Sequence, residues 1–242
     1  MNGETKKKSV GSVLYDDVMG GLRPMIPFVA GGGILMAISF MFGMRIGDNS
    51  VNQFAKILYE IGHNNAMLLM IPIFAGFIAH TIAGQDALAP GMIGGMIAKT
   101  TGSGFLGGIV AGFLAGYLVK LLNKLLSNFP EDFQSIKKLL IIPVISTFVV
   151  GIVMLCVVSV PMAWLNQGLT GFIDGLGTQN LVLTGMVIGG MMAVDLGGPI
   201  NKVAYTFAVA AISNGNYYPM AAAMVGGVVP PPVSYTHLTL PT

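Results

Sequence analysis

Charged residues are scarce in this chain of 242 residues. Only 12 side chains are Lys or Arg and 10 are Asp or Glu, so 9% are charged, against about 25% in a typical soluble domain. A soluble protein of this length needs a polar shell around its core, and so few charges cannot coat one. Disorder is also excluded, because 54% of the residues are hydrophobic and disordered chains have low hydrophobicity and high charge.

Cysteine is nearly absent as well. Cys156 is the only one, which excludes a disulfide framework. The net charge of +2 leaves no extended basic surface, so we expect no nucleic-acid partner. The sequence also indicates no catalytic centre, no metal site and no cofactor. The remaining class is a polytopic membrane protein.

Long runs without charge give the architecture. They cover residues 24–44, 61–85, 87–98, 100–119, 139–173 and 175–194, and the stretch after Lys202. A hydrocarbon core about 30 Å thick needs about 20 apolar residues of helix, whereas membrane strands alternate polar and apolar residues. The runs therefore predict an all-α, multi-span helical bundle with broken or re-entrant segments. Run 139–173 is expected to hold one span near 139–161, followed by a looser segment around 164–171.

Lysines set the expected topology. Basic residues before the first span place the N-terminal segment, residues 1–23, in the cytoplasm, and the Lys-rich segment 120–138 is expected there too. An even number of crossings must lie between them, so we count the short run 87–98 as a short or broken crossing. Within the basic segment we expect a second short helix that ends at Lys137 and Lys138.

The last ten residues differ from the rest of the chain. Residues 233–242, VSYTHLTLPT, are polar and resemble the translation of a sequencing adapter. We expect them to be an artefact, with a partial transmembrane domain over residues 24–232.

Glycines recur at helical spacing. Residues Gly102, Gly104 and Gly107 match the dinucleotide pattern G-x-G-x-x-G, but neither a preceding strand nor a following acid supports that interpretation. A second pattern recurs every fourth residue, which lets helix backbones approach closely in lipid. It predicts packing seams at Gly104, Gly108, Gly112 and Gly116, at Gly91 and Gly95, and at Gly185 and Gly189.

Two segments, residues 79–91 and 193–205, place polar side chains beside helix-breaking Gly and Pro. Irregular backbone at membrane depth occurs inside protein or along a wet cavity, and ionisable groups there usually mark a substrate path. The carboxylate of Asp195 is an acceptor, the amide of Asn201 donates and accepts, and the ammonium of Lys202 is a donor. Together these groups suit a neutral, polyhydroxylated ligand. The predicted substrate-binding residues are Asp195, Gly197, Gly198, Pro199, Asn201, Lys202, His80, Gly84, Gln85 and Pro90. Two alternatives remain: Asp195 and Lys202 as a structural pair, and His80 as a structural histidine.

Three stretches resemble one family. DDVMGGLRPMIPFVAGGGILMAI, IPIFAGFIAHTIAGQDALAPGMIGGMIA and AVDLGGPINKVAYTFA are similar to the membrane subunit IIC of bacterial fructose-type sugar phosphotransferase systems. The resemblance implies a homodimeric, multi-span permease of the glucose superfamily in the bacterial inner membrane, surrounded by lipid. It would bind sugar, with fructose as the default, and present it to a phosphorylated IIB domain, which receives phosphate through IIA and HPr.

The resemblance also implies missing parts. The family's Ile-Thr-Glu-Gly motif, whose glutamate contacts sugar, is not found here and is expected beyond residue 232. The phosphoryl-donor cysteine belongs to the IIB domain, so the chain would be the permease component of a phosphotransferase. Two alternatives stay open: an ion-coupled secondary transporter that uses Asp195 as its coupling site, and a membrane scaffold that does not transport.

Overall fold

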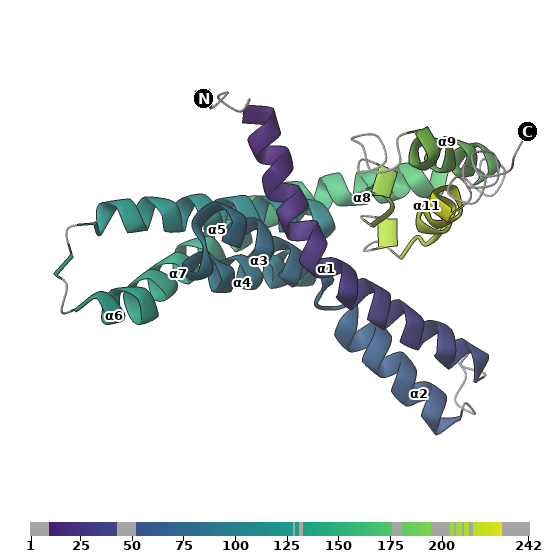
Figure 1. Ribbon diagram of the computed structural model, residues 1–242, viewed down its shortest axis with the longest axis horizontal. Coiled ribbons are helices and arrows are strands. Elements are labelled where there is room, and N and C mark those ends of the chain that lie inside the picture. Colours follow the sequence, from purple (N-terminus) through teal and green to yellow (C-terminus); the bar gives the residue numbers. More distant parts are fainter. Residues whose placement is uncertain are drawn as a thin grey trace, which may run out of the picture. The chain divides into compact units, whose positions relative to one another are not determined.

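The described part of the chain is helical. The computed structural model describes residues 10–42, 52–127, 129–130, 133–175, 181–194, 204–205, 207–209, 211–212 and 215–228. They belong to two compact units, Met1–Ala163 and Trp164–Thr242, and contain no strand (Figure 1). The predicted all-α class is confirmed.

Four helices among these residues are long and apolar enough to cross a membrane. They are Gly11–Met41, Gln53–Ala83, Gly104–Leu125 and Gln134–Gly168, and a shorter apolar helix covers Leu181–Ala193. Each overlaps a predicted charge-free run, which confirms a polytopic membrane protein. The helices extend beyond the runs because they also include charged residues, such as Asp17 and Arg23 in the first half of Gly11–Met41.

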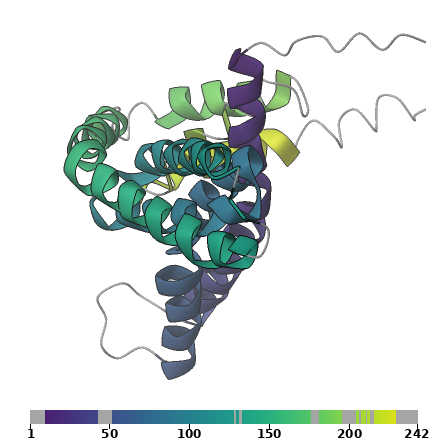
Figure 2. The ribbon, with the colours of Figure 1, turned by 90° about the vertical axis from the view of Figure 1, so that its left-hand side faces the viewer.

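Helix α1 (Val10–Met41) continues through Pro24 and Pro27. It packs beside α2 (Gln53–Tyr59) and the π-helical segment η1 (Glu60–Ala66), as Figures 1 and 2 show. A Cβ atom added to Gly62 would lie 2.6 Å from the carbonyl oxygen of Gly32. The two backbones therefore meet directly, and side chains larger than hydrogen at this crossing would separate them.

Helices α3 (Met70–Ala83), α4 (Leu88–Thr100) and α5 (Gly104–Leu125) form the core of the first unit. Nine of the 14 residues of α3 are buried, and Phe74 stacks on Phe105 of α5 with ring centroids 4.4 Å apart. The helix at the centre of this unit is thus α3, which has α1, α4 and α5 around it.

The predicted glycine seams lie on these helices. A Cβ on Gly95 would meet Pro72 and Ala75 of α3, and one on Gly91 would meet Ala79, so α4 runs antiparallel to α3. On α5, a Cβ would meet Ile71 from Gly108, Ile78 from Gly112 and Ile82 from Gly116, so α5 runs parallel to α3. The seams are confirmed at these five glycines, and close packing at Gly104 stays a prediction.

Helix α4 is short. Its 13 residues span about 20 Å at 1.5 Å per residue, less than the hydrocarbon thickness of about 30 Å. Asp86 and Lys99 lie at opposite ends of this segment. The helix directions agree with a short crossing, and the crossing itself stays a prediction.

The segment after the basic loop is one continuous helical stretch, Gln134–Gly168. Five elements follow one another along it: α6 (Gln134–Ile136), π-helical η4 (Lys137–Ile141), α7 (Ile142–Val153), π-helical η5 (Met154–Val158) and α8 (Ser159–Gly175). Helix α8 continues beyond Gly168 to Gly175. The short helix predicted to end at Lys137 and Lys138 is therefore wrong, because the helix continues through both lysines. The predicted looser segment around 164–171 is also wrong, since α8 passes through it.

Pro161 did not end this helix, for a geometric reason. Proline lacks an N–H and clashes with the carbonyl four residues earlier, which here belongs to Val157 in the π-helical η5. The wider π turn accommodates the proline ring. The same relation holds for Pro143, whose fourth preceding residue, Leu139, lies in η4.

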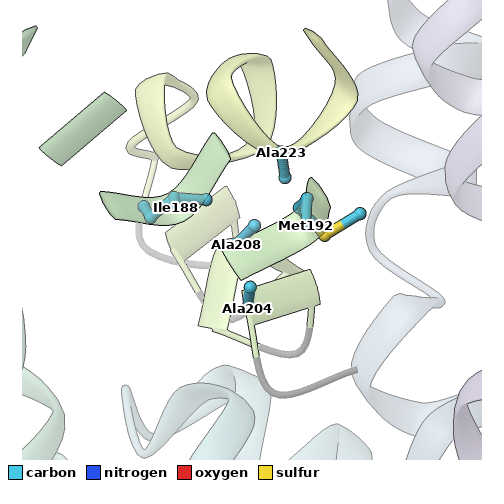
Figure 3. Packing of buried hydrophobic residues seen from close by; sticks show 5 residues of the cluster. All are labelled: Ile188, Met192, Ala204, Ala208 and Ala223. Atoms are coloured by element: carbon cyan, nitrogen blue, oxygen red, sulfur yellow. The ribbon is translucent and has the colours of Figure 1, made fainter. Parts of the chain in front are cut away.

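The second unit contains α9 (Leu181–Val194) and α11 (Tyr218–Val228). A Cβ on Gly226 would lie 2.5 Å from the Cα of Gly189, so the two helices touch backbone to backbone. The predicted seam holds at Gly189 but not at Gly185, which has nothing within 4 Å of such a Cβ. Figure 3 shows the small buried cluster beside this crossing, which consists of Ile188, Met192, Ala204, Ala208 and Ala223.

Candidate functional site

The predicted site residues divide into two groups. Four of them lie in the described part of the first unit: His80, Gly84, Gln85 and Pro90. The other six fall outside the described residues: Asp195, Gly197, Gly198, Pro199, Asn201 and Lys202. Helix α9 ends at Val194, directly before the second group.

Gly84 creates the predicted helix break. It ends α3 with φ 75° and ψ −159°, a region of the backbone map that is essentially restricted to glycine. Its N–H donates to the carbonyl of His80 (2.8 Å), and its own carbonyl accepts from the N–H of Ala87 (3.1 Å). A single turn of 3₁₀ helix, η2 (Gln85–Ala87), then leads into α4. The interruption predicted from the sequence is confirmed at this position.

The other side chains around the break differ in exposure. Gln85 is exposed, whereas Pro90, in the first turn of α4, is fully buried. His80 is half-buried in the last turn of α3, and its ring lies 5.8 Å from that of Phe77 at 52°. The chain thus brings the four predicted residues to one end of the α3–α4 hairpin. Their contact with a sugar stays a prediction.

A further polar residue lies beside this break. Asn123 of α5 donates from Nδ2 to the Oδ2 atom of Asp86, 3.4 Å away, and both side chains are half-buried. Sequence reasoning missed Asn123 because it lies between Lys120 and Lys124 in the basic segment. The sequence does contain a signal for Asn123, because helical spacing places it on the same face of α5 as Gly112 and Gly116.

The arrangement can bind hydroxyl groups. Gln85 supplies an amide that both donates and accepts, Asp86 supplies a carboxylate that accepts, and His80 supplies an imidazole that can do either. Each hydroxyl of a polyol needs both kinds of partner. The break therefore has the hydrogen-bonding chemistry of a site for a neutral, polyhydroxylated ligand.

The described part of the second unit has a different character. A groove of about 390 Å³ lies against α9 beside helical residues 204–205 and 207–209. Of the described residues that line it, Thr184 is polar and the others are apolar: Leu183, Val187, Ile188, Met191, Ala204 and Phe207.

Comparison with known proteins identifies the family. The profile of the family described as "Phosphotransferase system, EIIC" matches residues 19–237, which is most of the chain. The chain belongs to this family. The match includes both polar segments noted in the sequence, residues 79–91 and 193–205, and it confirms the resemblance.

Curated relatives agree with this family. The chain is 48% identical over 234 residues to the "PTS system fructose-specific EIIABC component" of Bacillus subtilis (strain 168), covering 94% of this chain and 37% of that protein. It is 49% identical over 184 residues to the "Fructose permease IIC component" of Bacillus amyloliquefaciens, covering 76% of this chain and 60% of that protein. It is 37% identical over 251 residues to the "PTS system fructose-specific EIIC component" of Haloferax volcanii, covering 94% of this chain and 66% of that protein. The chain thus spans only part of the length of these relatives. No solved structure matches it significantly.

Proposed function

We propose that the chain is part of a permease that moves a sugar, fructose by default, across the bacterial inner membrane and presents it for phosphorylation by a partner IIB domain. The family match over residues 19–237 carries this proposal. The relatives named above are described as fructose-specific or as a fructose permease. The hydrogen-bonding groups at the α3–α4 break fit a polyhydroxylated substrate, which supports the proposal independently.

Phosphorylation would make transport one-way. A phosphate group adds close to two negative charges at neutral pH, and a charged product crosses an apolar path poorly. Uptake would then need no ion gradient. A IIA protein and HPr would supply phosphate to IIB, and we further propose that the permease works as a homodimer in lipid.

The charges and helix directions support an orientation. Gly20 of α1 contacts Thr81 near the C-terminal end of α3, while Gly32 contacts Gly62 and Ala66 before α3 begins. Helix α1 is therefore antiparallel to α3, and α5 is parallel to it. The start of α1 and the end of α5, both flanked by lysines, then belong to the same side. We propose that this side is the cytoplasm, in keeping with the positive-inside rule.

The test is uptake by the intact gene product, expressed with its flanking sequence in cells that lack their own fructose permease. We expect radiolabelled fructose to accumulate as fructose phosphate, and membranes from these cells to phosphorylate fructose only when phosphoenolpyruvate and the soluble carriers are present. Accumulation must survive an uncoupler of the proton gradient. Free fructose that is lost on uncoupling would instead support an ion-coupled transporter.

A further inference from the structure

The face of α5 that packs on α3 leads to the helix break. Gly112 lies against Ile78 and the carbonyl of Ala75, and Gly116 lies against Ile82, one residue before α3 ends. Asn123 follows Gly116 by about two helical turns, so it lies on the same face of α5 but past the end of α3. The close glycine packing thus carries Asn123 to the point where the chain turns from α3 into α4.

Asn123 is hydrogen-bonded to the turn itself. Its Nδ2 atom donates to the carboxylate of Asp86 (3.4 Å), which is the middle residue of the three-residue η2. Among the described residues, neither side chain has another hydrogen-bond partner. Because η2 is a single turn, restraining Asp86 also restrains the backbone of the adjacent Gln85.

The hydrogen bond adds a side-chain link between the turn and α5 to the packing already described. The break is held by its own backbone hydrogen bonds at Gly84 and Ala87, and these do not connect it to α5. A hydrogen bond to a charged acceptor is stronger than one between neutral groups, and the 3.4 Å between Nδ2 and Oδ2 is at the long end for such a bond. The Asp86–Asn123 pair therefore limits how the turn can tilt relative to α5.

We propose that Asn123 is a positioning residue: through Asp86 it holds the turn at residues 84–87 in the conformation that binds the translocated sugar. This inference rests on the proposed function. If Asn123 only joined two helices, its loss would lower stability and leave the affinity for sugar unchanged. If Asn123 is a positioning residue, its loss lowers the affinity for sugar even when the amount of folded protein is unchanged.

Four variants of the intact protein test this role in the fructose uptake assay. Asn123→Ala and Asp86→Ala each remove the Asp86–Asn123 hydrogen bond. We expect each to raise the KM for fructose about fivefold or more, because a hydrogen bond to a charged group is lost. Asn123→Asp places two carboxylates side by side and is expected to raise KM further, because like charges repel. Adding Asp86→Asn to Asn123→Asp restores one carboxylate and one amide with their places exchanged. We expect this exchange to return KM to within about threefold of wild type, with a residual loss smaller than one hydrogen bond to a charged group.

The chain offers a matched control. Asn64 donates to the carboxylate of Glu60, so the same two chemical groups pair, but within one helix and away from the break. We expect Asn64→Ala to leave KM within about twofold of wild type, since exposed pairs of this kind contribute little. Vmax is normalised to the amount of permease in the membrane, and thermal stability is measured on the purified protein for every variant.

The outcomes separate this inference from the proposed function. If the wild-type protein shows no phosphoenolpyruvate-dependent uptake, the proposed function fails. If the wild type transports but Asn123→Ala keeps its KM, the positioning role is overturned, whether or not stability falls. An exchanged pair that is no better than Asn123→Asp also overturns it. A raised KM in both alanine variants, with recovery in the exchange, supports it.

Discussion

Gly84 is the residue at which backbone geometry and candidate function meet. Its φ of 75° and ψ of −159° lie outside the left-handed helical region that asparagine tolerates, in a region almost restricted to glycine. Space is not the constraint, because a Cβ at this position would meet nothing within 4 Å. The conformation alone therefore requires glycine.

We predict that Gly84→Ala and Gly84→Asn are both harmful and to a similar degree. Each should cost about 1–3 kcal/mol of stability or force the turn into another shape, and in either case fructose uptake should fall. Thermal denaturation of the purified protein and uptake at a saturating sugar concentration measure the two effects. Gly168→Ala is the control, since Gly168 is an ordinary helical glycine with nothing near its Cβ position. A benign Gly84→Asn would show that the turn tolerates a side chain.

A second prediction at the scale of the residue concerns the face of α5 that carries its glycines. A Cβ on Gly112 would lie 2.7 Å from Cβ of Ile78 and 2.8 Å from the backbone oxygen of Ala75. Gly112→Ala must therefore push α5 away from α3, and we expect a loss of about 1–3 kcal/mol. Gly31→Ala in α1, where a Cβ meets nothing within 4 Å, should be neutral or stabilising by up to about 1 kcal/mol. Equal melting temperatures for the two variants would contradict the packing at Gly112.

At the scale of the element, the π-helical segments control which face of a helix is buried. In the stretch Gln134–Gly168 the buried residues Ile142, Ser146, Val150 and Met154 follow one another at intervals of four. Across η4 and η5 the interval becomes five, from Lys137 to Ile142 and from Met154 to Ser159. Hydrogen bonds in a π-helix join residues five apart, so this longer interval keeps the buried residues on one side.

This assignment separates two neighbours that look alike in the sequence. Met154 is fully buried, whereas Leu155 is 55% exposed. We predict that Met154→Ala lowers the free energy of unfolding by about 2–5 kcal/mol, while Leu155→Ala changes it by less than about 1 kcal/mol. Unfolding by heat in a mild detergent compares the two. A larger effect at Leu155 would mean that the buried face is assigned wrongly.

Helix α4 carries a prediction about topology. Its ends bear the exposed residues Ala89 and Thr100. In a Cys156→Ser background, a membrane-impermeant maleimide should label Ala89→Cys in inside-out vesicles and Thr100→Cys in intact spheroplasts. Labelling of both from one side would show that α4 enters and leaves the membrane on the same face.

At the scale of the whole molecule, we predict an even number of crossings before the basic segment. We predict that protease tags placed at the N-terminus and after Ser127 are both cleaved in inside-out vesicles and both protected in spheroplasts. The reason is that the start of α1 and the end of α5 belong to the same side of the first unit. A tag after Ser127 that is cleaved only in spheroplasts would require an odd number of crossings.

Much of this architecture was predictable from charge alone. Residues 100–119 and 139–161 were expected to be spans because they lack charge. Helix α5 covers most of the first, and the continuous helical stretch Gln134–Gly168 covers the second. The break at Gly84 was predictable because glycine and polar side chains interrupt an apolar run. The π-helical turns were not, since they shift the spacing of buried residues by one and so blur the pattern of a regular helix.

The site was predictable only in part, for a related reason. Gln85 and Gly84 stand out as polar and flexible residues in an apolar segment, so local sequence indicates them. Asn123 does not stand out, because it is surrounded by the lysines of a basic segment and reaches the break through packing of helices distant in sequence. Asp195, Asn201 and Lys202 lie outside the described residues, and their role stays a prediction.

The wide turns η4 and η5 have a consequence for how this family can vary. A π-helical turn holds one more residue than the α-helical turn that could replace it, while the buried face on either side stays the same. Residues Lys137–Ile141 and Met154–Val158 are therefore places where a homologous chain can lose one residue, reverting to regular helix, without altering the core. Single-residue gaps in alignments of the family should concentrate there, inside membrane helices rather than in the loops where length changes usually accumulate.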